Sequence, residues 1–388
     1  MNVKGGLLFS VTITVLSILG CATNKLSNLS LEHSSQYYNY IKPDFTRYVD
    51  VSTQWLKENR RFISNDENAE LLMNAPFELK PDVPTNKAVL LVHGLGDSPF
   101  YFSDIAQSLV DDGYLVQVLL LPGHGSKPED MLLPSYADWQ YIVDHYAELL
   151  TSQYDEVWLG GYSTGANLVT INAIENDNIA GLLLFSPGFQ SRTPFLEKLT
   201  PIIASVMDWG YQTQETNFSR YNSVTFNGAI AYSDSANILR EKLNNKQLRI
   251  PTYIAVSEAD SIIDPDAILT IFQKSFTHKN NVMSWYGERD IASSRVQKLT
   301  MKKPEMMVST GSHMSTIFSP NNAYYGVGGS KKICDNSFDS DATKQCLSGE
   351  PVWFSAWGYE EDNKVHARLT WNPYFEQSGK IIKDIMTQ

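Results

Sequence analysis

The sequence is poor in cysteine, has no excess of basic charge and contains no apolar run long enough to cross a membrane comfortably. Its 388 residues include three cysteines and carry a formal net charge of −12. Nucleic-acid binding usually needs a basic face, so the acidic balance disfavours that class of partner. No histidine lies at metal-ligand spacing from the downstream cysteines Cys334 and Cys346, so no metal site is predicted.

The residues that are present are typical of an ordinary globular protein. Hydrophobic residues make up 43% of the chain and aromatic residues 12%, which is enough for a large buried interior. The chain is long for one core and short for three domains, and it contains no internal repeat.

The longest apolar run lies at the N-terminus. Residues 7–19 follow Lys4, contain no charge and are too few for a comfortable membrane span, so residues 1–20 are predicted to be a secretory signal peptide. The run ends in "ILGC", which resembles the bacterial lipoprotein box, whose cysteine is acylated. We therefore expect a protein of the bacterial cell envelope that is anchored to the membrane through lipid on Cys21, with Ala22 favouring the outer membrane by analogy. The alternatives are an ordinary signal peptide cleaved nearby and an anchor left uncleaved.

Cys334 and Cys346 form an even pair once Cys21 is set aside. In an oxidising compartment they are predicted to form a disulfide around a polar, loop-like stretch, and closing that loop would stabilise the fold by about 3 kcal/mol. Two free thiols are the alternative.

Strand-like and helix-like segments alternate over most of the chain. Near-continuous apolar strands separated by helices predict an α/β protein with a mostly parallel central sheet covered by helices. Strands are predicted at 88–94, 115–123, 156–162, 181–187, 251–260 and 305–311. Helices are predicted at 44–60, 66–74, 101–112, 135–151, 165–176, 265–276 and 374–386.

The same pattern predicts the domain organisation. Residues 21–84 would form a tether and an N-terminal helical segment, and residues 85–388 an α/β domain. Two stretches interrupt the alternation and are interpreted as insertions, namely a cap at about 188–245 and a smaller insertion at 279–304. A C-terminal extension would begin at about residue 320.

Ser163 is the candidate nucleophile. It lies in "GGYSTGA", directly after the predicted strand 156–162 and before the predicted helix 165–176. Small glycines on either side let a strand turn sharply into a helix and expose the serine hydroxyl, which is the arrangement of a nucleophile elbow. A serine needs a base to accept its proton, so the remaining sequence must supply one.

The base and the orienting acid are expected to follow Ser163 in the order acid, then histidine. Asp260 ends the strand-like "YIAVSEAD" and is the predicted acid, with Asp264 as the alternative, although Asp264 and Asp266 have the positions of helix caps. His313, in "TGSHMS", is the predicted base.

Three other histidines are weaker candidates for the base. His278 is interpreted as a solvated residue at a helix end and His366 as an exposed strand residue. His93 comes too early in the chain and is expected to shape its loop. The oxyanion donors are expected to be the backbone N–H groups of Thr164 and of Leu95, in "HGLGDSP".

Six motifs, "LLVHGLGDSP", "LLLPGHGSKPED", "DWQ", "GGYSTGA", "SEAD" and "GSHM", follow one another over roughly residues 85–318. In this order they resemble the α/β-hydrolase superfamily, most closely its monoglyceride lipase, lysophospholipase and small carboxylesterase branch. The resemblance implies an α/β-hydrolase fold and ester hydrolysis through an acyl-enzyme, with no metal or organic cofactor. The N-terminal helical segment, the 279–304 insertion and the C-terminal extension depart from the compact family pattern and leave the substrate open.

Three functional hypotheses follow from the sequence. The first is a lipoprotein esterase or (lyso)lipase that acts on a small-molecule or lipid acyl ester. The second is a thioesterase, peptidase or acyltransferase with the same triad. The third is a non-catalytic binding protein of the envelope, which the complete set of triad candidates disfavours.

Overall fold

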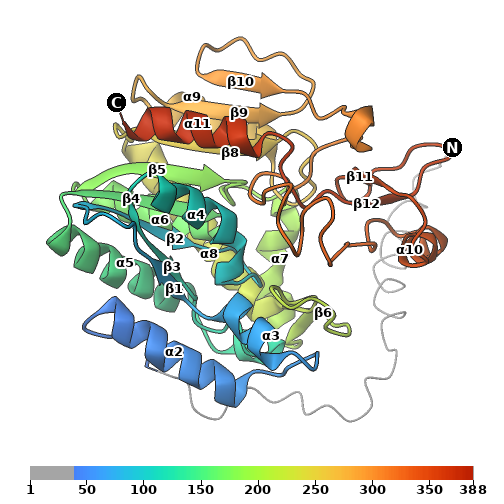
Figure 1. The fold of residues 1–388 in the computed structure, drawn as a ribbon, viewed down its shortest axis with the longest axis horizontal. Coiled ribbons are helices and arrows are strands. Elements are labelled where there is room, and N and C mark those ends of the chain that lie inside the picture. Colours follow the sequence, from blue (N-terminus) through green and yellow to red (C-terminus); the bar gives the residue numbers. More distant parts are fainter. Residues whose placement is uncertain (1–38, 388) are drawn as a thin grey trace, which may run out of the picture.

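An eight-stranded sheet forms the centre of the protein in the computed structural model, which describes residues 39–387 (Figure 1). Every pair of neighbouring strands is parallel except the first, in which β1 is antiparallel to β3. The strands in spatial order are β1 (Phe77–Leu79), β3 (Leu115–Leu119), β2 (Lys87–Val92), β4 (Glu156–Tyr162), β5 (Ile179–Phe185), β8 (Thr252–Ser257), β9 (Val282–Tyr286) and β10 (Val296–Leu299).

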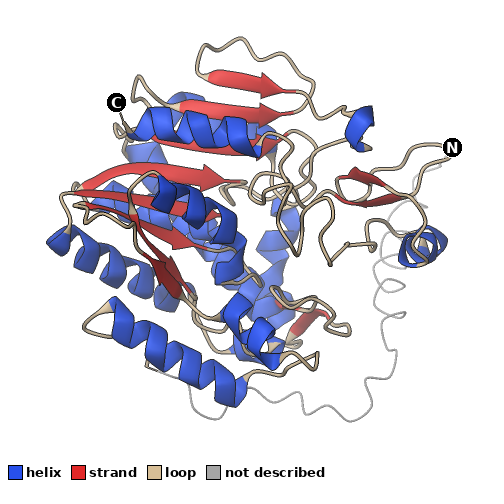
Figure 2. Ribbon diagram, in the orientation of Figure 1, coloured by secondary structure: helices blue, strands red, loops and turns tan. Residues whose placement is uncertain are grey.

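Helices cover both faces of this sheet (Figure 2). Successive side chains of a strand point to opposite faces. In β2, accordingly, Leu90 joins one apolar cluster and Leu91 the other, and both are fully buried. One cluster includes residues of α2 (Phe45–Asn59), α5 (Tyr136–Gln153), α6 (Thr164–Glu175), α8 (Phe226–Asn245) and α9 (Pro265–Ser275). The other includes residues of α4 (Ser103–Asp111) and α11 (Phe375–Met386).

The predicted α/β-hydrolase fold class is confirmed, and most of the predicted elements lie where they were expected. Local signals set several of the helix starts, because side chains of Asp44, Asp66, Ser135 and Asp264 accept backbone N–H groups at the first turns of α2, α3 (Glu67–Asn74), α5 and α9.

The predicted strand at 305–311 and the predicted insertion at 279–304 are both wrong. The last two strands of the sheet, β9 and β10, lie inside the supposed insertion. Residues 305–311 instead begin inside a short 3₁₀ turn, Pro304–Met306, and Met307 has a positive φ of 54°. Proline lacks the N–H that a strand would donate, and a positive φ is incompatible with extended backbone.

A cap lies between β5 and β8 in the chain. It contains α7 (Pro194–Ala204), the small hairpin of β6 (Trp209–Tyr211) and β7 (Val224–Thr225), and α8. Helix α8 packs against both α6 and α7. Large apolar side chains of the α7 region remain at the surface: Phe195 is 70% exposed and Val206 80% exposed.

The C-terminal extension contains α10 (Ser340–Leu347), β11 (Trp353–Ser355), β12 (His366–Arg368) and α11. The predicted disulfide joins Cys334 and Cys346, with their Cα atoms 5.5 Å apart. The predicted signal peptide (residues 1–20), Cys21 and the part of the predicted tether that precedes residue 39 lie outside the described residues. No helix between residues 39 and 387 is long and apolar enough to span a membrane.

Candidate active site

Ser163 occupies a sharp turn between β4 and α6. Its backbone has φ 52° and ψ −114°, a conformation that a non-glycine residue adopts only when its surroundings enforce it. Three backbone hydrogen bonds supply that constraint. The Ser163 N–H donates to Phe185 O at 3.0 Å, and its carbonyl accepts from Ala166 N at 3.1 Å and Gly188 N at 2.9 Å. Ser163 itself is 8% exposed.

The glycines of this turn are required by close backbone contacts. A Cβ atom on Gly165 would lie 2.0 Å from Val92 O, and one on Gly161 would lie 2.4 Å from Ala166 N. A Cβ on Gly94 would lie 3.0 Å from the Ser163 Cβ. The motif therefore permits α6 to start directly against β2 and the loop that follows β2.

Asp260 and His313 are joined by a hydrogen bond of 2.7 Å between Asp260 Oδ2 and His313 Nδ1. Asp260 is fully buried after β8, and its other oxygen accepts the N–H groups of Ile262 at 2.8 Å and Ile263 at 3.1 Å. A carboxylate fixed in this way orients the imidazole and stabilises its charged form.

The backbone of His313 is held next to the serine turn. Its carbonyl accepts hydrogen bonds from the Ser186 hydroxyl at 2.7 Å and the Tyr162 hydroxyl at 3.3 Å. The Tyr162 ring lies 5.1 Å from the His313 ring, centroid to centroid. Within residues 39–387 no direct hydrogen bond joins Ser163 to His313, a contact that often tightens only when substrate is bound.

Two backbone N–H groups beside Ser163 are free of protein partners. Neither the N–H of Leu95 nor that of Thr164 donates a hydrogen bond within the described part of the chain. The Thr164 hydroxyl is also buried without a partner there. Unpaired donors next to a candidate nucleophile have the arrangement of an oxyanion site.

Two buried histidines hold the loop that contains Leu95. His93 Nε2 accepts the N–H of Leu121 at 3.1 Å, and His124 Nε2 accepts the N–H of Gly96 at 2.9 Å. Burial lowers the pKa of His93 to about 4. Burial, followed by the nearby His93, lowers the pKa of His124 well below its usual value. Both rings are therefore neutral at pH 7 and serve as acceptors that shape the loop.

The alternative acid and bases lie in other surroundings. Asp264 caps α9 through the N–H groups of Asp266 and Ala267, and Asp266 pairs with Arg289. His278 accepts the N–H of Asn280 in the loop after α9. His366 is in the expected strand, but the expectation that it is exposed is wrong.

The reason for the burial of His366 is its packing in the C-terminal extension. It is 8% exposed, lies edge-on against the Tyr359 ring with centroids 5.3 Å apart, and is within hydrogen-bonding distance of the Ser309 hydroxyl at 3.3 Å.

Sequence reasoning missed three residues that support this site. Ser186 donates to the His313 carbonyl, and Arg192 donates to the backbone carbonyls of Asp260 and Glu258. His124 accepts the N–H of Gly96 in residues 94–98, which we call the oxyanion loop. Ser186 directly follows β5 and has a positive φ of 42°, so its place at a strand end was a readable signal. His124 lies in the quoted motif "LLLPGHGSKPED", whereas Arg192 has no local signal.

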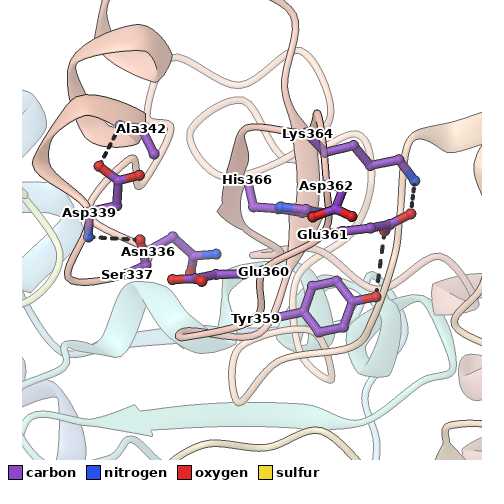
Figure 3. Close-up of a pocket in the computed structure, with 10 residues that line it drawn as sticks. All are labelled: Asn336, Ser337, Asp339, Ala342, Tyr359, Glu360, Glu361, Asp362, Lys364 and His366. Atoms are coloured by element: carbon purple, nitrogen blue, oxygen red, sulfur yellow. Dashed lines mark hydrogen bonds and ion pairs between the residues drawn. The ribbon is translucent and has the colours of Figure 1, made fainter.

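A separate cavity of about 480 Å³ lies in the C-terminal extension (Figure 3). Two of its acidic side chains have local partners: Asp339 caps α10, and Glu361 accepts hydrogen bonds from Lys364 and Tyr359. No group of three or more potential metal ligands occurs among residues 39–387. None of the triad candidates lines this cavity.

The chain is similar in sequence to known hydrolases. Residues 83–235 match the sequence model of a family described as serine aminopeptidase, S33. The chain is 30% identical over 95 residues to a thermostable monoacylglycerol lipase from a Bacillus species, covering 24% of this chain and 38% of that protein. It is 27% identical over 162 residues to the esterase YbfF of Escherichia coli, covering 42% of this chain and 56% of that protein.

The chain thus spans less than two thirds of the length of either curated relative. Among solved structures, a monoglyceride lipase from Saccharomyces cerevisiae aligns with a TM-score of 0.47 and 15% identity, over 57% of this chain and 85% of the other.

Proposed function

We propose that this chain, an α/β-hydrolase, is a serine hydrolase that cleaves carboxylic esters through an acyl-enzyme on Ser163. The observation that carries the proposal is the buried Asp260–His313 hydrogen bond beside the strained serine turn. Asp260 and His313 follow Ser163 in the order that this fold requires. The similarity to a monoacylglycerol lipase and an esterase supports the same reaction class.

In the proposed reaction, His313 Nε2 accepts the Ser163 proton as Ser163 Oγ attacks the ester carbonyl. Asp260 keeps the proton of the imidazole on Nδ1 and stabilises the imidazolium that forms. The N–H groups of Leu95 and Thr164 donate to the oxyanion of the tetrahedral intermediate. His313 then protonates the leaving alcohol, and water attacks the acyl-enzyme by the same route in reverse.

The proposed substrates are lipid-like or monoacyl esters. This substrate class is supported by the similarity to a monoacylglycerol lipase over 95 residues and by the apolar surface of the α7 region. We also propose that lipid on Cys21 anchors the protein in the bacterial cell envelope, which would bring the site close to lipid substrates. The support for the anchor is the "ILGC" motif alone.

A peptidase that uses the same triad is the second candidate. The observation in its favour is the match of residues 83–235 to a family described as serine aminopeptidase. A panel of aminoacyl 4-nitroanilides, assayed beside 4-nitrophenyl esters, separates the two reactions by the bond that is cleaved.

The decisive experiment compares hydrolysis of 4-nitrophenyl esters of graded chain length by the wild-type protein and by Ser163→Ala and His313→Ala. We expect both variants to lose turnover. Ser152→Ala and His278→Ala are matched controls, because Ser152 is exposed at the end of α5 and His278 lies in a separate loop. Undiminished turnover by Ser163→Ala would exclude the mechanism, and labelling by a fluorophosphonate probe identifies the nucleophile independently.

The anchor is tested by membrane partitioning of the full chain. Cys21→Ser is expected to release the protein from the membrane fraction, with Cys334→Ser as the control. Unchanged partitioning of Cys21→Ser would reject the lipid anchor without affecting the proposed reaction.

A further inference from the structure

Residues 215–221 of the cap, which we name the strap, are held by the N-terminal helical segment and by the C-terminal extension. We call these two segments the terminal extensions. From the N-terminal side, the Phe218 carbonyl accepts hydrogen bonds from Arg60 at 3.0 Å and Asn74 at 2.7 Å. From the C-terminal side, the Tyr324 hydroxyl accepts the Phe218 N–H at 2.9 Å, and the Tyr325 hydroxyl donates to Asn217 at 2.8 Å. The N-terminal helical segment and the C-terminal extension, which both depart from the compact family pattern, thus converge on the strap.

The strap is also bonded directly to the oxyanion loop. The Tyr221 N–H donates to the Gly96 carbonyl at 2.7 Å, and the Tyr221 hydroxyl donates to the Gly123 carbonyl at 3.2 Å. Since Gly96 directly follows Leu95, the terminal extensions fix the position of the strap relative to the candidate oxyanion donor.

Arg220 is the charged residue that this arrangement places beside the reacting centre. Its guanidinium lies 3.9 Å from the sulfur of Met314, the residue after His313. It also lines a small cavity together with Gly96 and Asp97 of the oxyanion loop. That cavity is about 20 Å³, which is room for one oxygen atom of a larger group and not for the whole group.

Three arginines line this cavity, but they differ in their partners. Arg60 pairs with Glu70 at 2.9 Å and Arg61 pairs with Glu129 at 2.9 Å. Arg220 has no carboxylate within 4.0 Å in the part of the chain that the structure describes. Within the described residues its guanidinium makes two long contacts, one to Tyr221 O at 3.4 Å and one to the Met314 sulfur at 3.9 Å.

Asp97 is the nearest opposite charge on the oxyanion loop, but it does not neutralise the guanidinium directly. The Asp97 carboxylate accepts a hydrogen bond from the Tyr101 hydroxyl, and it lies close to Gly94, since a Cβ atom on Gly94 would lie 2.6 Å from Asp97 Oδ2 and 3.0 Å from the Ser163 Cβ. A partly buried guanidinium normally has a paired anion, because its desolvation is otherwise uncompensated. Donors of Arg220 therefore remain available to a group that enters the site.

We infer that Arg220 is a specificity-determining residue that recognises a compact anionic group, a carboxylate or a phosphate, on the ester substrate. The inference rests on the proposed ester hydrolysis at Ser163. A planar guanidinium offers two parallel N–H donors to such a group. The strap and both terminal extensions would hold those donors in place before the substrate binds, which lowers the entropy cost of recognition.

The test uses two matched pairs of substrates with the full-length protein and measures acid release at constant pH. Methyl butyrate and monomethyl succinate differ by a carboxylate on the acyl side. Monobutyrylglycerol and butyrylglycerol phosphate differ by a phosphate on the alcohol side. We expect kcat/KM for the anionic member of one pair to exceed that of its neutral partner by about 10- to 100-fold, the range of a hydrogen-bonded charge pair.

Variants at Arg220 then assign the preference to this side chain. Arg220→Met is expected to abolish the ratio of anionic to neutral kcat/KM, mainly through KM, and Arg220→Lys to restore part of it. Asp97→Asn is expected to raise the ratio, because it removes a carboxylate that repels the anion. Arg249→Met is the matched control, since Arg249 is exposed and lies outside the strap.

Two results would overturn the inference. One is a wild-type ratio near one in both pairs, which needs no variant to fold. The other is an unchanged ratio in Arg220→Met. Either result, obtained with hydrolysis that still depends on Ser163, leaves the proposed reaction standing, whereas loss of Ser163 dependence refutes the reaction itself.

Discussion

Two regions of the molecule meet at Ser163, and they are built in different ways. The carboxyl edge of the sheet supplies Ser163, Asp260 and His313 from strand ends and the loops that follow, and backbone hydrogen bonds fix them. The strap and the terminal extensions supply no triad candidate and are joined by side-chain hydrogen bonds between segments more than 100 residues apart. The first region contains the triad candidates, and the second contributes the Arg220 charge near Met314, the residue after His313.

The largest effect should come from the first region. Asp260→Asn keeps the size of the side chain but cannot hold the imidazole in the required tautomer, so kcat is expected to fall about 10⁴-fold. Steady-state kinetics with a 4-nitrophenyl ester measure the loss. Asp264→Asn is the control, because asparagine caps a helix about as well as aspartate and α9 should be unaffected. Comparable losses in the two variants would show that Asp260 is not the orienting acid.

The sequence was sufficient for the first region because its signals are local. Gly161, Ser163 and Gly165 define the turn within five residues, and Asp260 directly follows an apolar strand. His313 was predicted as the base because it follows the predicted strand 305–311; that strand is absent from the described residues, yet His313 lies within hydrogen-bonding distance of Asp260. The apolar run "EMMV" resembles a strand, but Pro304 and the positive φ of Met307 prevent one.

The second region could not be predicted for the opposite reason. Arg60 donates to Phe218 across 158 positions, and no pattern near either residue marks that contact. In the sheet itself, β9 was missed because it is only five residues long, and β10 because its four residues include two polar ones and only one that is buried. Long-range contacts of this kind depend on how the cap is folded, which hydrophobic periodicity does not encode.

The next largest expected effect is a loss of stability when an ion pair of the second region is broken. Arg60→Met leaves the fully buried Glu70 carboxylate without its cation, and the free energy of unfolding is expected to fall by about 3–5 kcal/mol. Chemical denaturation measures this loss, with the exposed Arg47→Met as the control. The double variant Arg60→Met/Glu70→Leu should recover part of the stability, because a buried pair replaced by apolar groups costs less than a broken one.

A smaller effect is expected from the disulfide, which lies further from Ser163 in the second region. Cys334→Ser/Cys346→Ser should lower stability by about 3 kcal/mol, the loop entropy of a closure of this length. Turnover of a neutral ester should stay close to the wild-type rate, since neither cysteine contacts the strap in the described hydrogen bonds. Hydrogen exchange should locate the loss in residues 331–368. A drop in turnover instead would mean that the extension acts on the site as a whole.

The smallest effect concerns Asp97, which lies where the two regions meet. Burial raises the pKa of Asp97 to about 6, although the Arg220 charge and the Tyr101 hydrogen bond act in the opposite direction. In the unfolded chain the carboxyl has its ordinary pKa of 3.8, so the folded protein binds the proton more tightly. The free energy of unfolding therefore falls as pH rises from about 4 to about 6, and the full cost is present at pH 7.

Asp97→Asn removes that cost and should stabilise the protein at pH 7 by roughly 1–2 kcal/mol, after the loss of part of the Tyr101 bond is allowed for. The gain should vanish below about pH 3, where the wild-type carboxyl is protonated in both states. Thermal unfolding of both proteins at the two pH values measures the difference. His93 and His124 act on stability with the opposite sign in this window, but they are common to both proteins and cancel. A gain that does not change with pH would show that folding leaves the pKa of Asp97 at its ordinary value. Neighbouring groups would then offset the effect of burial on the Asp97 carboxylate, and this carboxylate would already act as the counter-ion of Arg220.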